Sequence, residues 1–144
     1  MHRAIRAVLV LGAMAVAVAA NAGLPDFQGR WKNVDAKTKG LTTLEITVTG
    51  TKAMVHAWGS CVPSDCDMGE WPATIYASRV DEDLARGAKA MLVAVGKTTT
   101  FVITKGEDGT LRCDVFSQFT DNSGRSNSLN SYLLRLSPIQ PRKK

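Results

Sequence analysis

The sequence lacks a complete motif for any known type of catalytic centre or cofactor site. It contains no Gly-x-Ser-x-Gly turn that would expose a nucleophilic serine, and neither Ser60 nor Ser64 has an identifiable base at a known spacing. With three cysteines, two histidines and no Cys-x-x-Cys or His pair, the chain is also poor in zinc ligands. We therefore expect a non-enzymatic protein without cofactor or metal, and we name no catalytic residue.

Long hydrophobic runs are absent, apart from one near the start at residues 7–20, directly after a short basic segment. Its 14 residues are too few for a membrane anchor, which needs about 20 apolar residues. The run ends in Ala-Asn-Ala, a small-residue processing site, so the sequence predicts a secretory signal peptide over residues 1–22 with cleavage before Gly23. The mature chain, residues 23–144, has the size of one domain. We expect it in the periplasm or outside the cell, with no membrane span.

An excess of basic charge strong enough to indicate nucleic-acid binding is also missing. The formal charge of the full chain is +5, and removal of the signal peptide, which carries Arg3 and Arg6, lowers it to +3. Part of the remainder lies in the basic tail at 142–144, which is expected to be a solvated chain end. The other basic residues are scattered among acidic ones, without the basic stripe and interleaved aromatic residues that single-stranded nucleic acid requires. Nucleic acid is therefore not an expected partner.

Short runs of alternating apolar and polar residues, bounded by Gly, Asn, Asp or Pro, repeat through the mature chain and predict an all-β protein. Eight runs joined by tight turns favour an antiparallel up-and-down barrel, because a meander of this length leaves two open edges unless it closes. A β-sandwich is the alternative, although the chain has few of the longer connections that it requires. The acidic run at 81–83 predicts a polar turn, with one helical turn over 81–87 as the alternative. The predicted strands are 27–33, 43–48, 52–58, 71–78, 88–95, 98–105, 110–119 and 131–136.

The segment 55–71 holds two cysteines, one histidine, two tryptophans and two aspartates. In an exported protein, the close spacing of Cys61 and Cys66 predicts a local disulfide. Cys113 lies on the apolar face of its predicted strand, where a buried thiol behaves as a small hydrophobic group, so we expect it to remain reduced.

Two metal sites in this segment are disfavoured by their ligand sets. A zinc site would have to combine the two cysteines with His56, which gives only three ligands. A calcium loop at Asp65, Asp67 and Glu70 fails because Gly69 stands where the third acid is needed.

The first predicted strand contains Gly29-Arg30-Trp31, and a Gly-x-Trp on the first strand of an eight-stranded antiparallel barrel resembles the calycin superfamily, which includes lipocalins and avidins. The resemblance implies a lipocalin-like barrel in which a basic side chain of the last strand packs over this tryptophan, and Arg135 stands where the pattern places it. Such a contact gains a cation–π interaction and satisfies carbonyls where the barrel closes. The avidin-like pattern ends at Asn33, and the biotin-contacting tryptophans of that family have no convincing counterparts, so biotin is not expected.

A longer pattern, W-G-x-C-x-P-x-D-C-D-x-G at 58–69 together with S-G-R-S at 123–126, resembles a group of small secreted bacterial proteins. The pattern indicates a family and not an activity. Arg125 in the second motif is expected to reach Asp65 and Asp67 if the two loops share one end of the barrel, and otherwise to be solvated.

Three large side chains, those of Met54, His56 and Trp58, share one face of the third predicted strand. Both faces of this strand are apolar, since the other consists of two alanines and a valine, so alternation does not decide which face points inward. Either His56 is a packed histidine satisfied by a strand neighbour, or all three side chains line the barrel interior together with Phe101 and Tyr132. In the second case the many Ala, Thr and Val positions leave room for a small ligand.

Three functions of different classes follow. The first is a secreted, non-enzymatic barrel that binds a small apolar or amphipathic ligand, oriented by His56. The second is a periplasmic inhibitor or envelope-interaction protein that works through the exterior loops 60–70 and 121–128, by analogy with secreted bacterial protease inhibitors built on similar Gly-x-Trp barrels. The third is a hydrolase, for which no residue set is named. A cavity of about 300 Å3 or more lined by Met54, His56 and Trp58 would support the first function, whereas a packed interior with these side chains outside would leave the loops as the working surface.

Overall fold

The computed structural model of the chain describes residues 25–82 and 84–138. The predicted signal peptide and the basic tail at 142–144 lie outside the described residues. A single turn of 3-10 helix, η1 (Pro25–Phe27), precedes the first strand. Within the described ranges, no helix is both long enough and apolar enough to cross a membrane.

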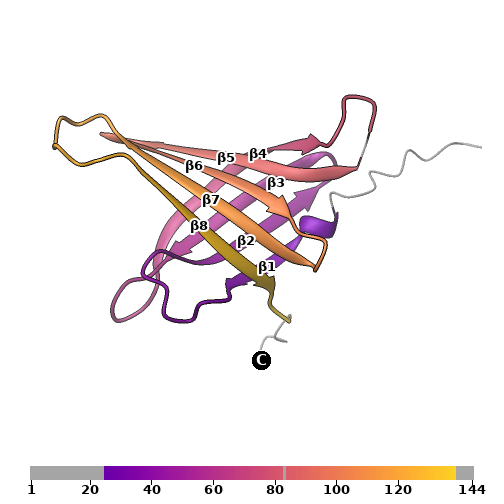
Figure 1. The fold of residues 1–144 in the computed structure, drawn as a ribbon, viewed down its shortest axis with the longest axis horizontal. Coiled ribbons are helices and arrows are strands. Elements are labelled where there is room, and N and C mark those ends of the chain that lie inside the picture. Colours follow the sequence, from indigo (N-terminus) through magenta and orange to yellow (C-terminus); the bar gives the residue numbers. More distant parts are fainter. Residues whose placement is uncertain (1–24, 83, 139–144) are drawn as a thin grey trace, which may run out of the picture.

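Eight strands follow in chain order, and each pairs antiparallel with the next (Figure 1). The last strand also pairs with the first, with Leu136 opposite Trp31, so the sheet closes into a barrel. The predicted up-and-down barrel is confirmed and the alternative β-sandwich is wrong, because each strand takes the sequence neighbour as its partner. The helical turn considered over 81–87 does not form, since residues 85–87 belong to a strand. The strands are β1 (Gly29–Asn33), β2 (Leu41–Thr49), β3 (Lys52–Gly59), β4 (Cys66–Ala77), β5 (Ala85–Ala94), β6 (Lys97–Lys105), β7 (Thr110–Phe119) and β8 (Ser128–Leu136).

One face of each strand contributes to the interior, as the alternation of side chains along a strand requires. In β2, for example, Leu44 and Ile46 are buried while Glu45 and Thr47 are not. Hydrophobic side chains from around the barrel meet in one cluster, so the barrel has a filled core over much of its length. Its buried members are Phe27, Trp31, Leu41, Leu44, Ile46, Val55, Ala57, Ala85, Ala88, Ala90, Phe101, Ile103, Leu111, Cys113, Val115 and Leu134.

Trp31 belongs to this core and is only 2 % exposed. Its indole N–H donates a 2.9 Å hydrogen bond to the carbonyl of Phe27, whose own side chain is fully buried, so helix η1 closes this end of the barrel. The expected packing of Arg135 over Trp31 is wrong. Because Leu134 points into the core, Arg135 points outward, and it lies opposite the exposed Lys32 in the strand register.

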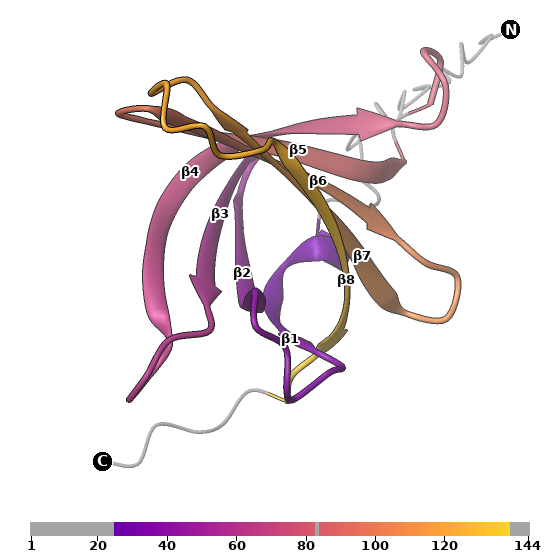
Figure 2. The same ribbon diagram turned by 60° about the vertical axis from the view of Figure 1, so that its left-hand side comes forward.

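Strands β4 and β5 separate before the barrel reaches its other end. Their pairing runs from Ala77 opposite Ala85 to Ala73 opposite Ala90. Beyond that point, in the part of the chain that is described, β4 pairs only with β3 and β5 only with β6. Pro72, the next residue of β4, has no N–H to donate to a neighbouring strand. The two strands diverge there (Figure 2). We call this end of the barrel, between the wall of β2–β4 and the wall of β5–β8, the mouth.

Candidate functional site

A cavity of about 290 Å3 lies in the open mouth, between the two walls. Its apolar part consists of Leu41 and Met68 on one side and of Phe101, Val115 and Tyr132 on the other. Gly40 and Gly59 also line the cavity. The remaining lining is polar or belongs to the disulfide: Lys39, Ser60, Cys61, Cys66, Lys97, Thr99, Ser117 and Asn130.

The polarity of the cavity changes along β6. Its inward-facing residues from the mouth toward the core are Lys97, Thr99 and Phe101, and only the last two are buried. Thr99 lies opposite Ser117 of β7, whereas Phe101 lies opposite Val115. A charge therefore stands nearest the opening, hydroxyl groups follow, and apolar side chains form the bottom. This gradient suits an amphipathic ligand.

A stacked aromatic pair connects the two walls at the bottom of the cavity. The rings of Trp71, on β4, and Phe101, on β6, are nearly parallel, with centroids 5.5 Å apart and an interplanar angle of 15°. Both side chains pack in the hydrophobic cluster. Such pairs stabilise beyond the area that they bury, so this contact helps to hold the walls at a defined distance.

Tyr132 approaches the loop between β1 and β2 very closely. A Cβ atom placed on Gly40 would lie only 1.9 Å from the phenol oxygen, so the position accepts no larger residue without movement of the ring or the loop. The backbone of Gly40 also accepts a 2.8 Å hydrogen bond from the N–H of Ser60. Tyr132 and the two loops therefore form one packed side of the mouth.

Phe101 and Tyr132 line the cavity as the sequence predicts, but Met54, His56 and Trp58 do not line it. Their placement in the interior is wrong, because the alternate residues of β3 are the buried ones. The small side chains face inward there since the interior beside β3 is occupied by large ones: Trp71 of β4 is the inner neighbour of Val55.

Trp58 instead takes part in a cluster on the outside of β1–β4. The ring of His56 stacks on its indole with centroids 3.9 Å apart, and the guanidinium carbon of Arg30 lies 4.7 Å from the indole centroid. The Nε2 atom of His56 lies 2.7 Å from Oδ1 of Asp67. That hydrogen bond, together with one from the backbone N–H of Gly69, holds the pKa of Asp67 below its usual value. These contacts tie β3 to its neighbours, which is the packed role considered for His56.

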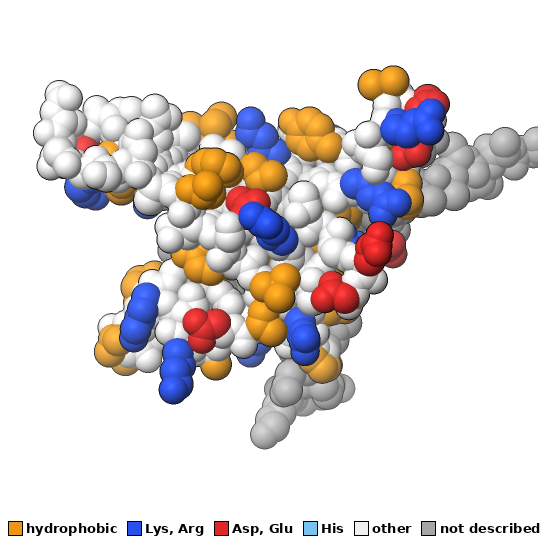
Figure 3. All heavy atoms as spheres, viewed as in Figure 1, with side chains coloured by type: hydrophobic (Ala, Val, Ile, Leu, Met, Phe, Trp, Pro, Cys, Tyr) orange, Lys and Arg blue, Asp and Glu red, His pale blue; other side chains and the backbone are white. Residues whose placement is uncertain are grey.

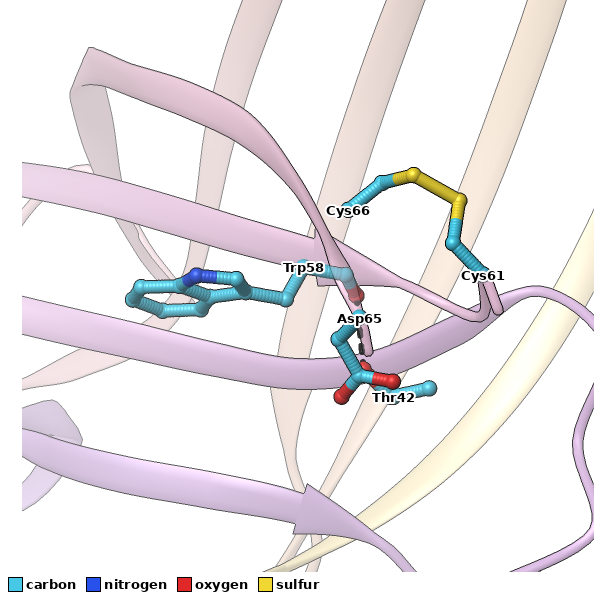
Figure 4. Close-up of a disulfide and its surroundings, with 5 residues drawn as sticks. All are labelled: Thr42, Trp58, Cys61, Asp65 and Cys66. Carbon is cyan, nitrogen blue, oxygen red and sulfur yellow. Dashed lines mark hydrogen bonds between the residues drawn. A yellow bond between two sulfur atoms is a disulfide. The ribbon is translucent and has the colours of Figure 1, made fainter. Parts of the chain in front are cut away.

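Cys61 and Cys66 form the predicted disulfide, with Cα atoms 5.4 Å apart. Figure 4 shows this loop anchored to β2: Oγ1 of Thr42 donates to the carboxylate of Asp65 at 2.7 Å and lies 3.1 Å from the carbonyl oxygen of Trp58. The indole of Trp58 points away from the disulfide in the same view. Both cysteines of the disfavoured zinc site are therefore bonded to each other. The described residues contain no cluster of three or more His, Cys, Asp or Glu placed to hold a metal ion.

Arg125 does not reach the acids of the disulfide loop, so that expectation is wrong. It forms an ion pair with Asp121 and donates a 2.8 Å hydrogen bond to Oγ of Ser123. Its guanidinium carbon lies 4.1 Å from the centroid of Phe119. Asp121 is four residues away in the same loop, whereas Asp65 lies on the opposite wall, so the local pairing is favoured. Hydrogen bonds from Ser123 and Arg125 lower the pKa of Asp121 to about 2.

Cys113 is free and fully buried in the core, as expected. Burial, with a smaller contribution from the charge of Asp114, raises its pKa to about 12. The thiolate needed for chemistry is therefore strongly disfavoured in the folded protein.

Sequence reasoning missed Lys39, Gly40, Met68 and Lys97 as parts of the cavity. Only Lys97 carries a readable signal, because it shares its face of the strand with Phe101. Lys39 and Gly40 enter through the position of the loop between β1 and β2, and Met68 lies near the start of β4, in a segment without clear alternation. A comparison of the chain with protein-family models, with curated proteins and with solved structures found no match. The functional argument therefore depends on the cavity itself.

Proposed function

We propose that the protein is a non-enzymatic barrel that binds a small amphipathic molecule in the cavity at its mouth. The observation that carries the proposal is the polarity gradient of a cavity of about 290 Å3 inside a closed barrel. Because one water molecule takes up about 30 Å3 of liquid, the cavity has room for about ten groups of that size. The apolar bottom favours the tail of such a ligand and the polar upper lining favours its head. The cavity expected from the sequence, one lined by Met54, His56 and Trp58, is not the one found, because these three side chains lie on the outer face of β3. The proposal therefore depends on the cavity beside Phe101 and Tyr132, and His56 has no part in this binding.

The two other functions have weaker support. Several charged groups of the exterior loops are engaged within the protein: Asp67 by His56, Asp65 by Thr42, and Arg125 by Asp121. This leaves the loops without an evident set of groups that would recognise an inhibited enzyme or an envelope protein. For a hydrolase, the histidine would need a nucleophile, and among the described residues it makes its hydrogen bond to an aspartate rather than to a serine or cysteine.

The proposed setting is the periplasm or the extracellular space. The Cys61–Cys66 disulfide supports it, because such bonds persist in oxidising compartments, and so does the predicted signal peptide. Mass spectrometry of the exported protein should give Gly23 as the first residue; a cytoplasmic product that retains Met1 would contradict this. A calycin-like origin is proposed on the Gly-x-Trp motif, whose tryptophan is buried where β1 meets β8.

The cavity can be tested by filling it. NMR titration of the purified chain with 1-octanol and octanoate should shift the amide signals of cavity residues and leave those of the outer cluster on β1–β4 unchanged. Ser117→Phe, which projects from β7 into the cavity, should abolish these shifts. Gln118→Phe, the next residue on the opposite face, is the matched control and should bind as the parent does.

Circular dichroism spectra of both variants should match that of the parent, which separates loss of the cavity from loss of the fold. Unchanged octanoate binding by the folded Ser117→Phe variant would refute the proposal, as would shifts confined to the outer surface.

A further inference from the structure

Lys97 is a charged residue on the inner face of the barrel wall. Thr99 and Phe101, on the same face of β6, are 2 % and 0 % exposed. Lys97 itself is half-buried, and its Nζ lies 5.5 Å from the ring centroid of Phe119, its opposite residue on β7. An ammonium group held toward an interior loses part of its hydration, so it gains more from a counter-ion than a fully solvated lysine does.

Among the described residues, no carboxylate forms an ion pair with Lys97. The ion pairs among residues 25–82 and 84–138 include neither Lys97 nor Lys39, and no Asp or Glu lines the cavity. Asp121 lies beside the same turn, since a Cβ on Gly96 would come within 2.6 Å of its Cβ, but its carboxylate pairs with Arg125. On the face of the molecule in Figure 3, by contrast, basic and acidic side chains are interspersed. The side chains that line the cavity therefore carry a net positive charge, whereas charges of both signs are mixed on this outer face.

Lys39 supplies a second positive charge from the opposite wall. It precedes Gly40, whose carbonyl accepts the N–H of Ser60, so the backbone beside Lys39 is tied to the disulfide loop. Lys39 and Lys97 line the same cavity, and the neutral donors of Ser117 and Asn130 lie with them in its polar lining.

We infer that the head of the ligand is an anion, such as a carboxylate, sulfate or phosphate group, held between Lys97 and Lys39. The inference rests on the proposed function of the cavity and names the chemical class of its ligand: an anionic amphiphile. Because ammonium groups act as point charges, the requirement is for negative charge more than for one head-group shape. The apolar part of the ligand extends from the head toward Phe101 and Met68.

The test compares probes that share one tail and differ in the head: octanoate, octyl sulfate, octyl phosphate, 1-octanol and octyltrimethylammonium. Binding to the full purified chain is measured by calorimetry below the micelle concentration of each probe. The three anions should bind about tenfold more tightly than 1-octanol, which is the effect of one charge-assisted contact of about 1.4 kcal/mol. The cation should bind most weakly. Added salt should weaken binding of the anions and leave that of 1-octanol unchanged, because it screens exposed charges. Differences among the anions identify the preferred head group.

Two variants test whether Lys97 and Lys39 cause the preference for an anionic head group. Lys97→Met and Lys39→Met should each reduce the preference for octanoate over 1-octanol while the affinity for 1-octanol stays the same. Lys89→Met is the matched control, because it removes the same charge from an exposed position on the outer side of β5. It should keep the full preference.

The outcomes separate this inference from the proposed function. Equal binding of octanoate and 1-octanol by the parent would overturn the anionic head group and leave the cavity as a binding site. An equal preference for octanoate in Lys97→Met, Lys39→Met and Lys89→Met would also overturn it. If none of the five probes binds, the proposed function fails and the inference fails with it.

Discussion

Replacement of Trp31 by alanine tests how the barrel is closed at its base. The indole is 2 % exposed and packs in the core beside η1. Its N–H is the donor to the carbonyl of Phe27 at 2.9 Å. The substitution therefore removes a large buried ring and leaves a carbonyl without its partner.

The expected loss of stability follows from these two effects. Truncation of a buried Trp or Phe to Ala costs about 3–5 kcal/mol, and loss of one buried hydrogen bond adds about 1 kcal/mol. Part of the cavity collapses in the variant, so we expect a total near 4 kcal/mol. A domain of this size has roughly 5–15 kcal/mol of stability. Trp31→Ala should therefore remain folded in water with roughly 1–11 kcal/mol of stability and should unfold at a clearly lower urea concentration than the parent.

Urea unfolding followed by circular dichroism measures this loss. Trp31→Phe keeps most of the ring and loses the donor, so it should cost about 1–2 kcal/mol. Trp58→Ala is the matched control on the outer surface, where the indole is only half-buried, and should cost less than half as much as Trp31→Ala. A loss below about 1 kcal/mol for Trp31→Ala, or a loss equal to that of Trp58→Ala, would refute the packing described for the base.

Four further outcomes are expected. Gly40→Ala should cost about 1–3 kcal/mol in urea unfolding and shift the ring signals of Tyr132, because the new Cβ would overlap the phenol oxygen; unchanged ring signals would contradict the close approach. A thiol reagent at pH 8 should not modify the native chain, whereas the unfolded, unreduced chain should return one thiol, since Cys113 is buried with a pKa of about 12; three thiols would rule out the disulfide. The pKa of Asp121 lies below its usual value, so its contribution to stability is complete above about pH 4 and is lost as the pH falls through about 2; an NMR titration of its carboxyl carbon with a midpoint near 3.8 would contradict this. In hydrogen exchange, alternate amides of residues 91–94 should be unprotected, because this stretch of β5 pairs with β6 alone, and uniform protection would mean that the mouth is closed.

Local signals in the sequence were sufficient for the strands and for the disulfide. The alternation in β2 and β6 predicts their buried faces correctly, and glycines at hairpin turns, such as Gly50 and Gly109 with positive φ, end the strands near the expected places. Cys61 and Cys66 are close enough in the chain to bond without help from the rest of the fold. The ends of the strands were predicted less accurately. β4 begins at Cys66, five residues before the predicted start, because its pairing with β3 extends into a segment without clear alternation.

The candidate site could be predicted only in part. Phe101 and Tyr132 were found because each lies on the clearly apolar face of its strand. Arg135 was misplaced because its position was taken from the resemblance to Gly-x-Trp barrels, whereas the alternation of side chains along β8 puts it on the face opposite Leu134. Arg125 was misplaced because the distance between two loops is set by the opening of the mouth, and a partner within its own loop was available.

By itself, the sequence determined an all-β chain of eight strands and a short disulfide loop, because these features depend on neighbours along the chain. Only the tertiary structure decided which face of β3 turns inward. Both faces are apolar, and the choice depends on the volume left by Trp71, which arrives from another strand. Only the tertiary structure brought Lys39 and Lys97 to one cavity, whose lining contains no Asp or Glu among the described residues. The two lysines lie far apart in sequence and come together when the barrel closes.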